Sequence, residues 1–213
     1  MNCKICNTDT RHYFDSQMEW DFYHCDKCQF FFKDPKHYLD SDKEIKVYQN
    51  HNNTFEAKGY VQMLEDFIDS TFGKYIDDIE DVLEFGCGPG PVLAEILEQK
   101  GLHVSRYDKF FFPKKVYENQ RYDLISTTEV LEHISDINSI MQFFHTHLKS
   151  DGYLAIMTQF HTNNPKEFLN WWYRKDPTHI CFFTPHTFEV LAKKHGFKIL
   201  KFDTKKSLLL QKI

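Results

Sequence analysis

Four cysteines near the start of the chain are spaced as the ligands of a single metal ion would be. They form two pairs, Cys3 with Cys6 and Cys25 with Cys28, and 18 residues separate the pairs. Two such pairs can place four thiolates about 2.3 Å from one tetrahedral Zn²⁺. Disulfides and unlinked thiols are the alternatives. Disulfides are disfavoured because the N-terminus carries no apolar signal segment and we expect a cytoplasmic protein. Since four protein ligands leave no open position, we predict a structural zinc site.

A second stretch with chemical potential is DVLEFGCGPG, residues 81–90, in which three glycines follow an apolar run. The apolar run predicts a buried strand, and the glycines predict a turn that lets a ligand approach the backbone. The helix that follows would present free N–H groups to a carboxylate or phosphate. Glu84 offers an acceptor to an amine or hydroxyl, and Asp108, 22 residues after Gly86, is placed to bind a ribose diol. A plain strand–turn–helix without a ligand is the alternative.

The elements that must position these residues alternate between strand and helix. The apolar patterns predict strands over 82–85, 102–107, 122–126 and 153–158, and helices over 91–100, 135–148 and 185–195. Two last strands, 198–202 and 207–210, are joined by a short connection and should pair antiparallel. This order predicts an α/β protein with a doubly wound sheet.

Three regions follow from these patterns. We predict a zinc-ribbon-like module over residues 1–36, a polar linker over 37–56, and the sheet domain over 57–213. A helix from Thr54 to about Ser70 leads into the sheet domain, and the linker beside it could fold over a ligand site. The metal would supply the folding free energy of the small N-terminal module, which cannot bury much surface alone.

The composition narrows the classes of function. The chain has 213 residues, a formal net charge of −5 and a pI of about 6.2, which disfavours a nucleic-acid binder. No stretch approaches the ~20 apolar residues that span a membrane. The runs Phe30–Phe32 and Phe110–Phe112 are too dense for one buried face, so each should span two surfaces or line a pocket or interface.

Several stretches together resemble the class I S-adenosylmethionine-dependent methyltransferases, over roughly residues 57–213. They are VLEFGCGPG (82–90), Asp108, YDLISTTEVLEH (122–133) and LKSDGYL (148–154). The resemblance implies a Rossmann-like doubly wound sheet of seven strands with the last strand antiparallel, and S-adenosylmethionine as cofactor. The cysteine pairs are similar to zinc modules of sugar C-methyltransferases and of a ribosomal RNA guanine methyltransferase. The run WWYRKDPTHI (171–180) is similar to a bacterial branch of small-molecule methyltransferases.

The resemblance also implies cofactor contacts. Asp108 would hold the ribose hydroxyls, and Thr128 and Glu129 would lie beside the methionyl end. The implied cofactor-binding residues are Glu84, Gly86, Cys87, Gly88, Gly90, Asp108, Lys109, Phe110, Thr128 and Glu129. Only 14 residues separate Asp108 from Asp123, where the family usually fits a helix and a strand. Residues 114–117 are then a minimal strand, and the adenine ring meets Glu118, Asn119 or the rings of Phe110–Phe112.

Methyl transfer is an in-line displacement that needs alignment and exclusion of water, and a hydroxyl or acidic carbon acceptor also needs a base. The candidate bases are His179, His161 and His133. His179 comes first, because it lies in a proline-containing loop and imidazole titrates in the useful range. The alternative for each is a structural role, which for His133 means orienting the loop after its strand.

Three functions stay open at this point. The first is a methyltransferase for a small-molecule acceptor, at oxygen or carbon, such as a sugar or polar metabolite. The second is an RNA methyltransferase that docks through the zinc module, and the third is a catalytically silent cofactor-binding scaffold; the final hairpin disfavours NAD. Trp171–Tyr173 could form a pocket wall, core or a homodimer contact, and Arg174 could pair with an anionic substrate or with Asp176.

Overall fold

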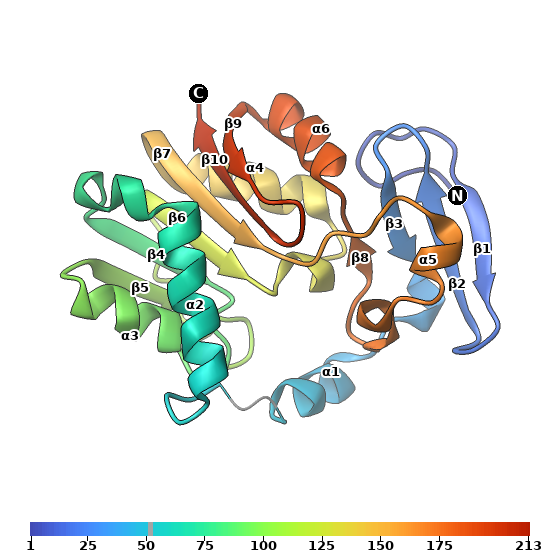
Figure 1. Ribbon diagram of the computed structural model, residues 1–213, viewed down its shortest axis with the longest axis horizontal. Coiled ribbons are helices and arrows are strands. Elements are labelled where there is room, and N and C mark those ends of the chain that lie inside the picture. Colours follow the sequence, from blue (N-terminus) through green and yellow to red (C-terminus); the bar gives the residue numbers. More distant parts are fainter. Residues whose placement is uncertain (51–52) are drawn as a thin grey trace.

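Two β-sheets lie side by side in the computed structural model, which describes residues 1–50 and 53–213 (Figure 1). The larger sheet has the strand order β5-β4-β6-β7-β10-β9. Its strands are β4 (Asp81–Phe85), β5 (His103–Tyr107), β6 (Tyr122–Thr128), β7 (Leu148–Met157), β9 (Phe197–Phe202) and β10 (Ser207–Lys212). The first four are parallel, and β10 runs antiparallel to both β7 and β9. The predicted antiparallel last strand is therefore confirmed.

The expected seventh strand does not form among the described residues, and the larger sheet has six strands. Residues 114–117 lie in bends and turns. The chain reverses directly after β5, where Asp108 and Phe112 exchange two backbone hydrogen bonds of 3.1 and 3.2 Å. This reversal occupies part of the 14-residue connection between Asp108 and Asp123, which is too short for both a helix and a strand. Pro113 follows it and has no N–H to offer a strand partner.

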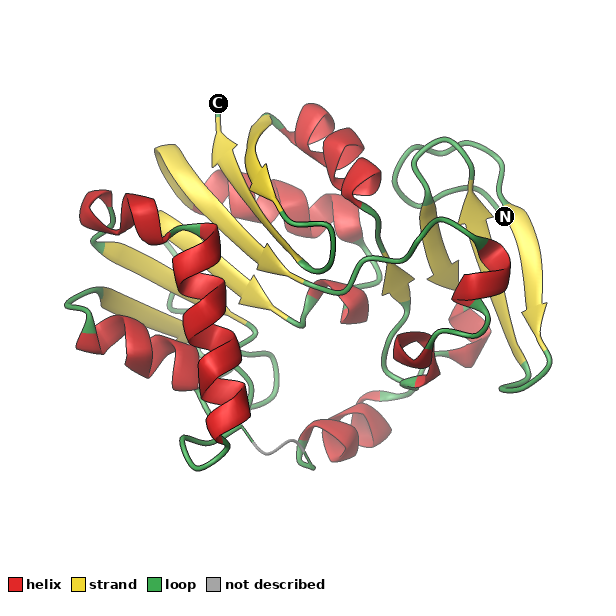
Figure 2. Cartoon of the chain, viewed as in Figure 1, coloured by secondary structure: helices red, strands yellow, loops and turns green. Residues whose placement is uncertain are grey.

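Helices cover both faces of the larger sheet (Figure 2). Residues of α2 (Lys58–Thr71) and α3 (Val92–Gln99) share a core with Val82, while α4 (Ile137–His147) and α6 (Pro185–His195) share the other core with Leu83. Neighbouring strand residues point to opposite faces, so each strand supplies both cores. The lead-in helix begins at Lys58 rather than at Thr54, and α6 ends as predicted, with Gly196 at φ 72°.

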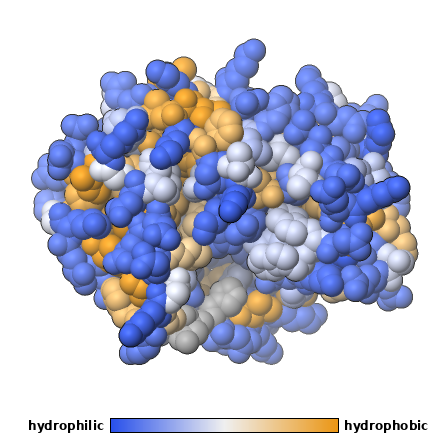
Figure 3. All heavy atoms as spheres, in the orientation of Figure 1, coloured by the Kyte–Doolittle hydropathy of each residue, from blue (hydrophilic) through white to orange (hydrophobic). Residues whose placement is uncertain are grey.

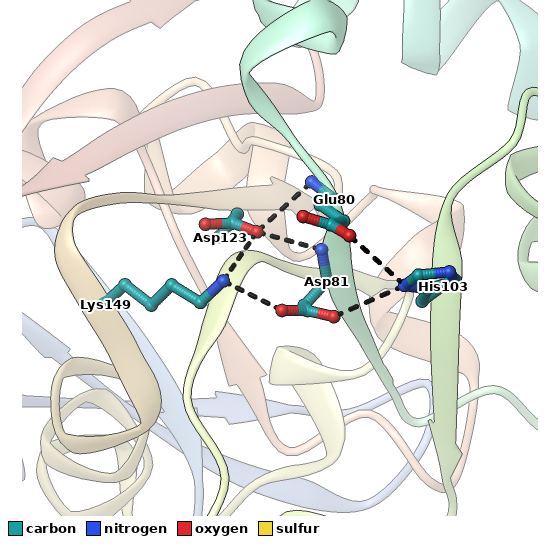
Figure 4. Close-up of polar contacts among 5 residues, drawn as sticks. All are labelled: Glu80, Asp81, His103, Asp123 and Lys149. Atoms are coloured by element: carbon teal, nitrogen blue, oxygen red, sulfur yellow. Dashed lines mark hydrogen bonds and ion pairs between the residues drawn. The ribbon is translucent and has the colours of Figure 1, made fainter.

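The amino-terminal edge of the larger sheet is held by a charged cluster (Figure 4). Lys149 Nζ lies 2.8 Å from Asp81 Oδ2 and 2.9 Å from Asp123 Oδ2. The same Asp123 oxygen accepts hydrogen bonds from the backbone N–H groups of Glu80 and Asp81. This cluster ties together the starts of β4 and β6 at the edge opposite the strands' carboxyl ends.

The smaller sheet is antiparallel and combines three N-terminal strands with one short strand from late in the chain. Its order is β1-β2-β3-β8, with β1 (Arg11–Asp15), β2 (Trp20–Cys25), β3 (Phe30–Lys33) and β8 (Cys181–Phe182). Phe30 and Phe32 join the core of the larger sheet, while Phe31 packs with Phe182 on the other side. The N-terminal strands thus share their sheet and core with residues far along the chain. The boundaries 1–36, 37–56 and 57–213 stay a prediction.

The stretch expected to be only a polar linker contains a helix. Asp40 caps α1 (Ser41–Tyr48) by accepting from the N–H of Lys43 at 2.9 Å. Shorter helical segments elsewhere are Pro35–His37, Gly73–Asp78, Leu131–His133, α5 (Pro165–Phe168) and Trp172–Lys175. In Figure 1, α1 lies below the two sheets, between them.

The face drawn in Figure 3 is mostly hydrophilic, with hydrophobic side chains in separate patches. Within the described ranges, no helix has both the length and the apolar character needed to cross a bilayer.

Candidate active site

A cavity of about 570 Å³ opens at the carboxyl ends of β4, β5 and β6. One side, here called the glycine-loop side, consists of residues 84–89 and 107–111. The other, the histidine side, consists of Glu44 and Tyr48 of α1, Glu129 and His133 after β6, and Trp172, Tyr173, Asp176 and His179. Ligands of open α/β sheets bind at this edge, so the cavity is the candidate active site.

The loop after β4 requires glycine because its backbone adopts conformations that other residues avoid. Gly86 and Gly88 have φ of 81° and 65°, and a Cβ on Gly86 would lie 2.3 Å from Val130 Cγ2. A Cβ on Gly90 would lie 1.9 Å from the carbonyl oxygen of Asn53. Of the ten residues implied to bind cofactor, nine line the cavity, and Gly90 lies outside the lining against Asn53.

Asp108 ties the two loops of the glycine-loop side together. Its Oδ2 accepts from the N–H of Gly88 at 3.0 Å, and its Oδ1 accepts from the N–H groups of Phe110 and Phe111 at 2.8 and 3.0 Å. A carboxylate has about four acceptor positions, so it can also accept from a ligand hydroxyl.

Glu84 is almost fully buried at the cavity, and its Oε2 has no hydrogen-bond partner among the described residues. Burial raises the pKa of its carboxyl to about 8, against the opposing attraction of Arg106. A buried acceptor without a donor is costly, so this oxygen is suited to a donor supplied by a ligand.

A family model described as a methyltransferase domain matches residues 48–201. The chain belongs to this methyltransferase family. The match spans the glycine loop, Asp108 and the histidines described below.

Solved methyltransferase structures have a similar fold. They include the mitomycin 7-O-methyltransferase MmcR (13% identity, TM-score 0.56, 79% of this chain and 60% of that one). A SAM-dependent methyltransferase from Archaeoglobus fulgidus is similar at 15% identity and TM-score 0.55, over 81% of this chain and 100% of that one. DesVI of Streptomyces venezuelae is similar at 11% identity and TM-score 0.54, over 83% of this chain and 100% of that one. This chain thus spans less than two thirds of MmcR. No curated protein matches the sequence significantly.

On the histidine side, two candidate bases meet. The rings of His133 and His179 lie 4.8 Å apart, and the ring of Tyr173 lies 4.1 Å from that of His179. Burial, followed by the neighbouring His179, lowers the pKa of His133 to about 3, so His133 is neutral at physiological pH. The third candidate, His161, lies outside the cavity lining, and its Nε2 is 3.0 Å from the carbonyl oxygen of Gln29.

Two glutamates, Glu129 and Glu132, lie near these histidines and share a hydrogen-bond donor. The hydroxyl of Tyr173 donates to Glu129 Oε2 at 2.9 Å or to Glu132 Oε1, which is closer still. Glu129 directly follows β6 and has φ 53°, a left-handed conformation that is uncommon for a non-glycine residue and is concentrated at functional sites.

The residues of the aromatic and basic run at 171–175 have different surroundings. Trp172 and Tyr173 line the cavity, while Trp171 packs against the cluster around Phe31 and Phe182. A homodimer contact through this run stays a prediction. The expected partners of Arg174 are wrong: its guanidinium is fully buried and pairs with Asp15 of β1 at 2.7 Å.

The four N-terminal cysteines converge on one point. Their sulfurs all lie within 4.8 Å of one another, with Cys3–Cys28 at 3.4 Å, Cys6–Cys25 at 3.5 Å and Cys6–Cys28 at 3.7 Å. Sulfurs bound tetrahedrally to one Zn²⁺ at 2.3 Å are about 3.8 Å apart. None of the six cysteines forms a disulfide. The donor set and its geometry therefore fit a zinc ion.

Sequence reasoning missed Glu44, Tyr48 and Asp176 as residues of the cavity lining, and it missed Glu132 beside that lining. Tyr48 packs its ring on those of Phe110 (5.9 Å) and His133 (5.2 Å), and its hydroxyl donates to Glu44 at 2.8 Å. The available signal was Asp40, a capping residue directly before the helix-forming run SDKEIKVY. The predicted linker therefore closes one side of the cavity.

Proposed function

We propose that this methyltransferase moves a methyl group from S-adenosylmethionine to an oxygen or carbon of a small polar acceptor. The observation that carries the cofactor assignment is the unpartnered Oε2 of Glu84, buried in the same cavity as Asp108. The cofactor's methionyl ammonium would supply the donor that Glu84 lacks, and its ribose hydroxyls would donate to Asp108.

The charge of the cavity supports a cationic cofactor. Its lining includes five acidic side chains, from Glu44, Glu84, Asp108, Glu129 and Asp176, but only one lysine, Lys109, and no arginine among the described residues. Glu84, whose pKa is about 8, would gain its negative charge when a cationic group binds beside it. Lys109 already lies 3.6 Å from Glu44. Such a lining favours a ligand with a sulfonium and an ammonium over the anionic pyrophosphate of NAD.

When bound, S-adenosylmethionine supplies an electrophilic methyl group on a sulfonium. Glu84, Asp108 and the glycine loop would hold it, with Gly86, Cys87, Gly88, Lys109, Phe110, Thr128 and Glu129 as further contacts. The rest of the histidine side would then bind the acceptor, with His179 as the first candidate to take its proton and His133 beside it. The small acceptor agrees with the cavity volume of about 570 Å³ and with the likeness to a mitomycin 7-O-methyltransferase.

For the cysteines we propose a structural zinc ion that positions the histidine side. Thr187 Oγ1 donates to the carbonyl of Cys28 at 2.9 Å, and β8, which follows His179, pairs with β3. Zinc would thus fix the sheet against which the acceptor-binding segment is held.

Titration calorimetry of the zinc-replete chain with S-adenosylhomocysteine tests the cofactor assignment, with NAD run in parallel. We expect micromolar binding of S-adenosylhomocysteine alone, which Asp108→Ala weakens about 100-fold and the exposed-acid control Glu95→Gln leaves unchanged. Absence of binding by folded, zinc-replete protein would overturn the proposal.

A further inference from the structure

A group of metal-ligand side chains lies at the histidine side, and the proposed methyl transfer gives no role to its most buried member, Glu132, which lies outside the cavity lining. Glu132, His133 and His179 each place one ligand atom within 4.8 Å of the other two. The side chain of Glu132 is fully buried, and His179 is only 7% exposed. These residues come from the turn after β6 and from the segment before β8, so two separate parts of the chain converge here.

Backbone carbonyls fix the orientation of both imidazole rings. His133 Nδ1 lies 3.0 Å from the carbonyl oxygen of Thr178, and His179 Nδ1 lies 2.7 Å from that of Tyr173. A carbonyl only accepts, so each Nδ1 carries a proton, and a metal would bind through Nε2. Metal-bound histidines are held in this way, with the other N–H donating to a carbonyl or carboxylate.

The carboxylates of the group are short of positive charge. Glu132 Oε2 and Glu129 Oε1 are buried and have no hydrogen-bond partner in the described part of the chain. Both glutamates converge on the Tyr173 hydroxyl, and neither forms an ion pair with a described basic side chain. Two neighbouring buried carboxylates repel each other unless a proton or a cation compensates them.

We infer that Glu132, His133 and His179 bind a first-row divalent cation such as Mn²⁺ or Zn²⁺, with Glu129 beside it. Imidazole with carboxylate is a ligand set that such ions prefer, whereas Mg²⁺ and Ca²⁺ prefer oxygen alone. Ligand atoms about 2.1 Å from one ion lie roughly 3 to 4.2 Å apart, so modest side-chain rotation closes the site.

The role of the ion rests on the proposed function. A hydroxyl acceptor would bind the cation through its oxygen, which lowers the pKa of the hydroxyl. The hydroxyl would release its proton to water, its oxygen would bond to the methyl carbon, and the methyl–sulfur bond would break to leave a neutral thioether. If the cation is bound, the Nε2 lone pair of His179 would be a metal ligand, and the cation would replace His179 as the activating group.

Mn²⁺ is the probe, because it disfavours the soft thiolates of the four-cysteine cluster. Zinc-replete protein is titrated with Mn²⁺, and the free ion is followed by electron paramagnetic resonance. We expect one Mn²⁺ per chain, with affinity at least about 30-fold weaker in Glu132→Gln and in His179→Ala. The control, His186→Ala with Glu189→Gln, removes an exposed histidine–carboxylate pair and should leave Mn²⁺ binding unchanged.

Electron–nuclear double resonance on the wild-type chain should detect two imidazole nitrogens on Mn²⁺, which keeps the test independent of any variant that fails to fold. No Mn²⁺ binding, or binding that His179→Ala leaves intact, would overturn the site. S-adenosylhomocysteine is titrated into the same sample. Its binding without Mn²⁺ binding defeats only the cation site, and Mn²⁺ binding without it defeats only the proposed cofactor.

Discussion

The two sides of the cavity are built in different ways. The glycine-loop side comes from two short stretches, residues 84–89 and 107–111, joined by local backbone contacts such as Gly86 N–H to the carbonyl of Tyr107 at 2.7 Å. The histidine side gathers residues from positions 44 to 179, and distant parts of the chain hold it in place. One side is therefore defined by a local motif, and the other by tertiary structure.

The N-terminal sheet is the main support of the histidine side. Lys33 donates its backbone N–H to the carbonyl of Ile180 at 2.9 Å, and its buried Nζ donates to that of Pro177 at 3.1 Å. Asp15 binds Arg174, two residues before Asp176. The comparison predicts that the glycine-loop side and the histidine side can be perturbed separately, which the following changes test.

Loss of the proposed zinc should have the largest effect. In Cys25→Ala with Cys28→Ala, the melting temperature should fall by more than about 10 °C, because the metal would supply folding free energy to the N-terminal sheet. Amide hydrogen exchange should become faster over residues 160–184, which include the part of the histidine side from Trp172 to His179. Exchange at 81–90, and binding of S-adenosylhomocysteine, should change only a few-fold. Equal disruption of both sides would refute their independence.

Breaking the ion pair between Arg174 and Asp15 comes next. Arg174→Ala leaves the Asp15 carboxylate buried and unpaired, which should lower the free energy of unfolding by about 3–5 kcal/mol in chemical denaturation. The matched control is Lys149→Ala, which removes the half-exposed ion pairs at the amino-terminal edge of the larger sheet (Figure 4). It should lower the free energy of unfolding by roughly 1 kcal/mol or less. A similar loss in both variants would mean that the Arg174 pair is not the support inferred here.

Asp108→Ala should change ligand binding on the glycine-loop side only. It removes the proposed ribose acceptor and leaves three backbone N–H groups of Gly88, Phe110 and Phe111 without their acceptor. The expected loss of about 100-fold in S-adenosylhomocysteine affinity corresponds to roughly 2.7 kcal/mol. Mn²⁺ binding on the histidine side should stay within a factor of about two. A parallel loss of Mn²⁺ binding would show that the two sides are coupled.

The same contrast explains what the sequence could predict. The larger sheet follows from apolar runs separated by glycine and capping residues, and the glycine-loop side follows from one continuous motif. The strand expected at 114–117 was a family feature imposed on too few residues, and the chain forms turns there instead. The helix α1 was overlooked because its apolar residues are few, although Asp40 marks its start.

The histidine side had no comparable local signal. His133 and His179 are 46 residues apart, and they meet because β8 adds to the N-terminal sheet soon after His179. Arg174 has Asp176 two residues away, yet the partner it finds is Asp15, which sequence distance gives no reason to choose. Pairings of this kind depend on how the two sheets pack, which no single segment encodes.

The smallest expected effect is a pH dependence of S-adenosylhomocysteine affinity that arises from Glu84 alone. Burial holds its pKa near 8, so in the ligand-free chain this carboxyl is mostly protonated at pH 6.5 and half ionised at about pH 8. The cofactor's ammonium favours the ionised form, so binding below pH 8 must release the proton. S-adenosylhomocysteine affinity should therefore rise about 10-fold from pH 6.5 to 8, with about one proton released per ligand at pH 6.5. Calorimetry in buffers of different ionisation enthalpy measures both quantities. Glu84→Gln should bind more weakly at pH 8 and lose the pH dependence. If the slope persists in that variant, the titrating group lies elsewhere, and the unpartnered oxygen of Glu84 is not the ammonium acceptor.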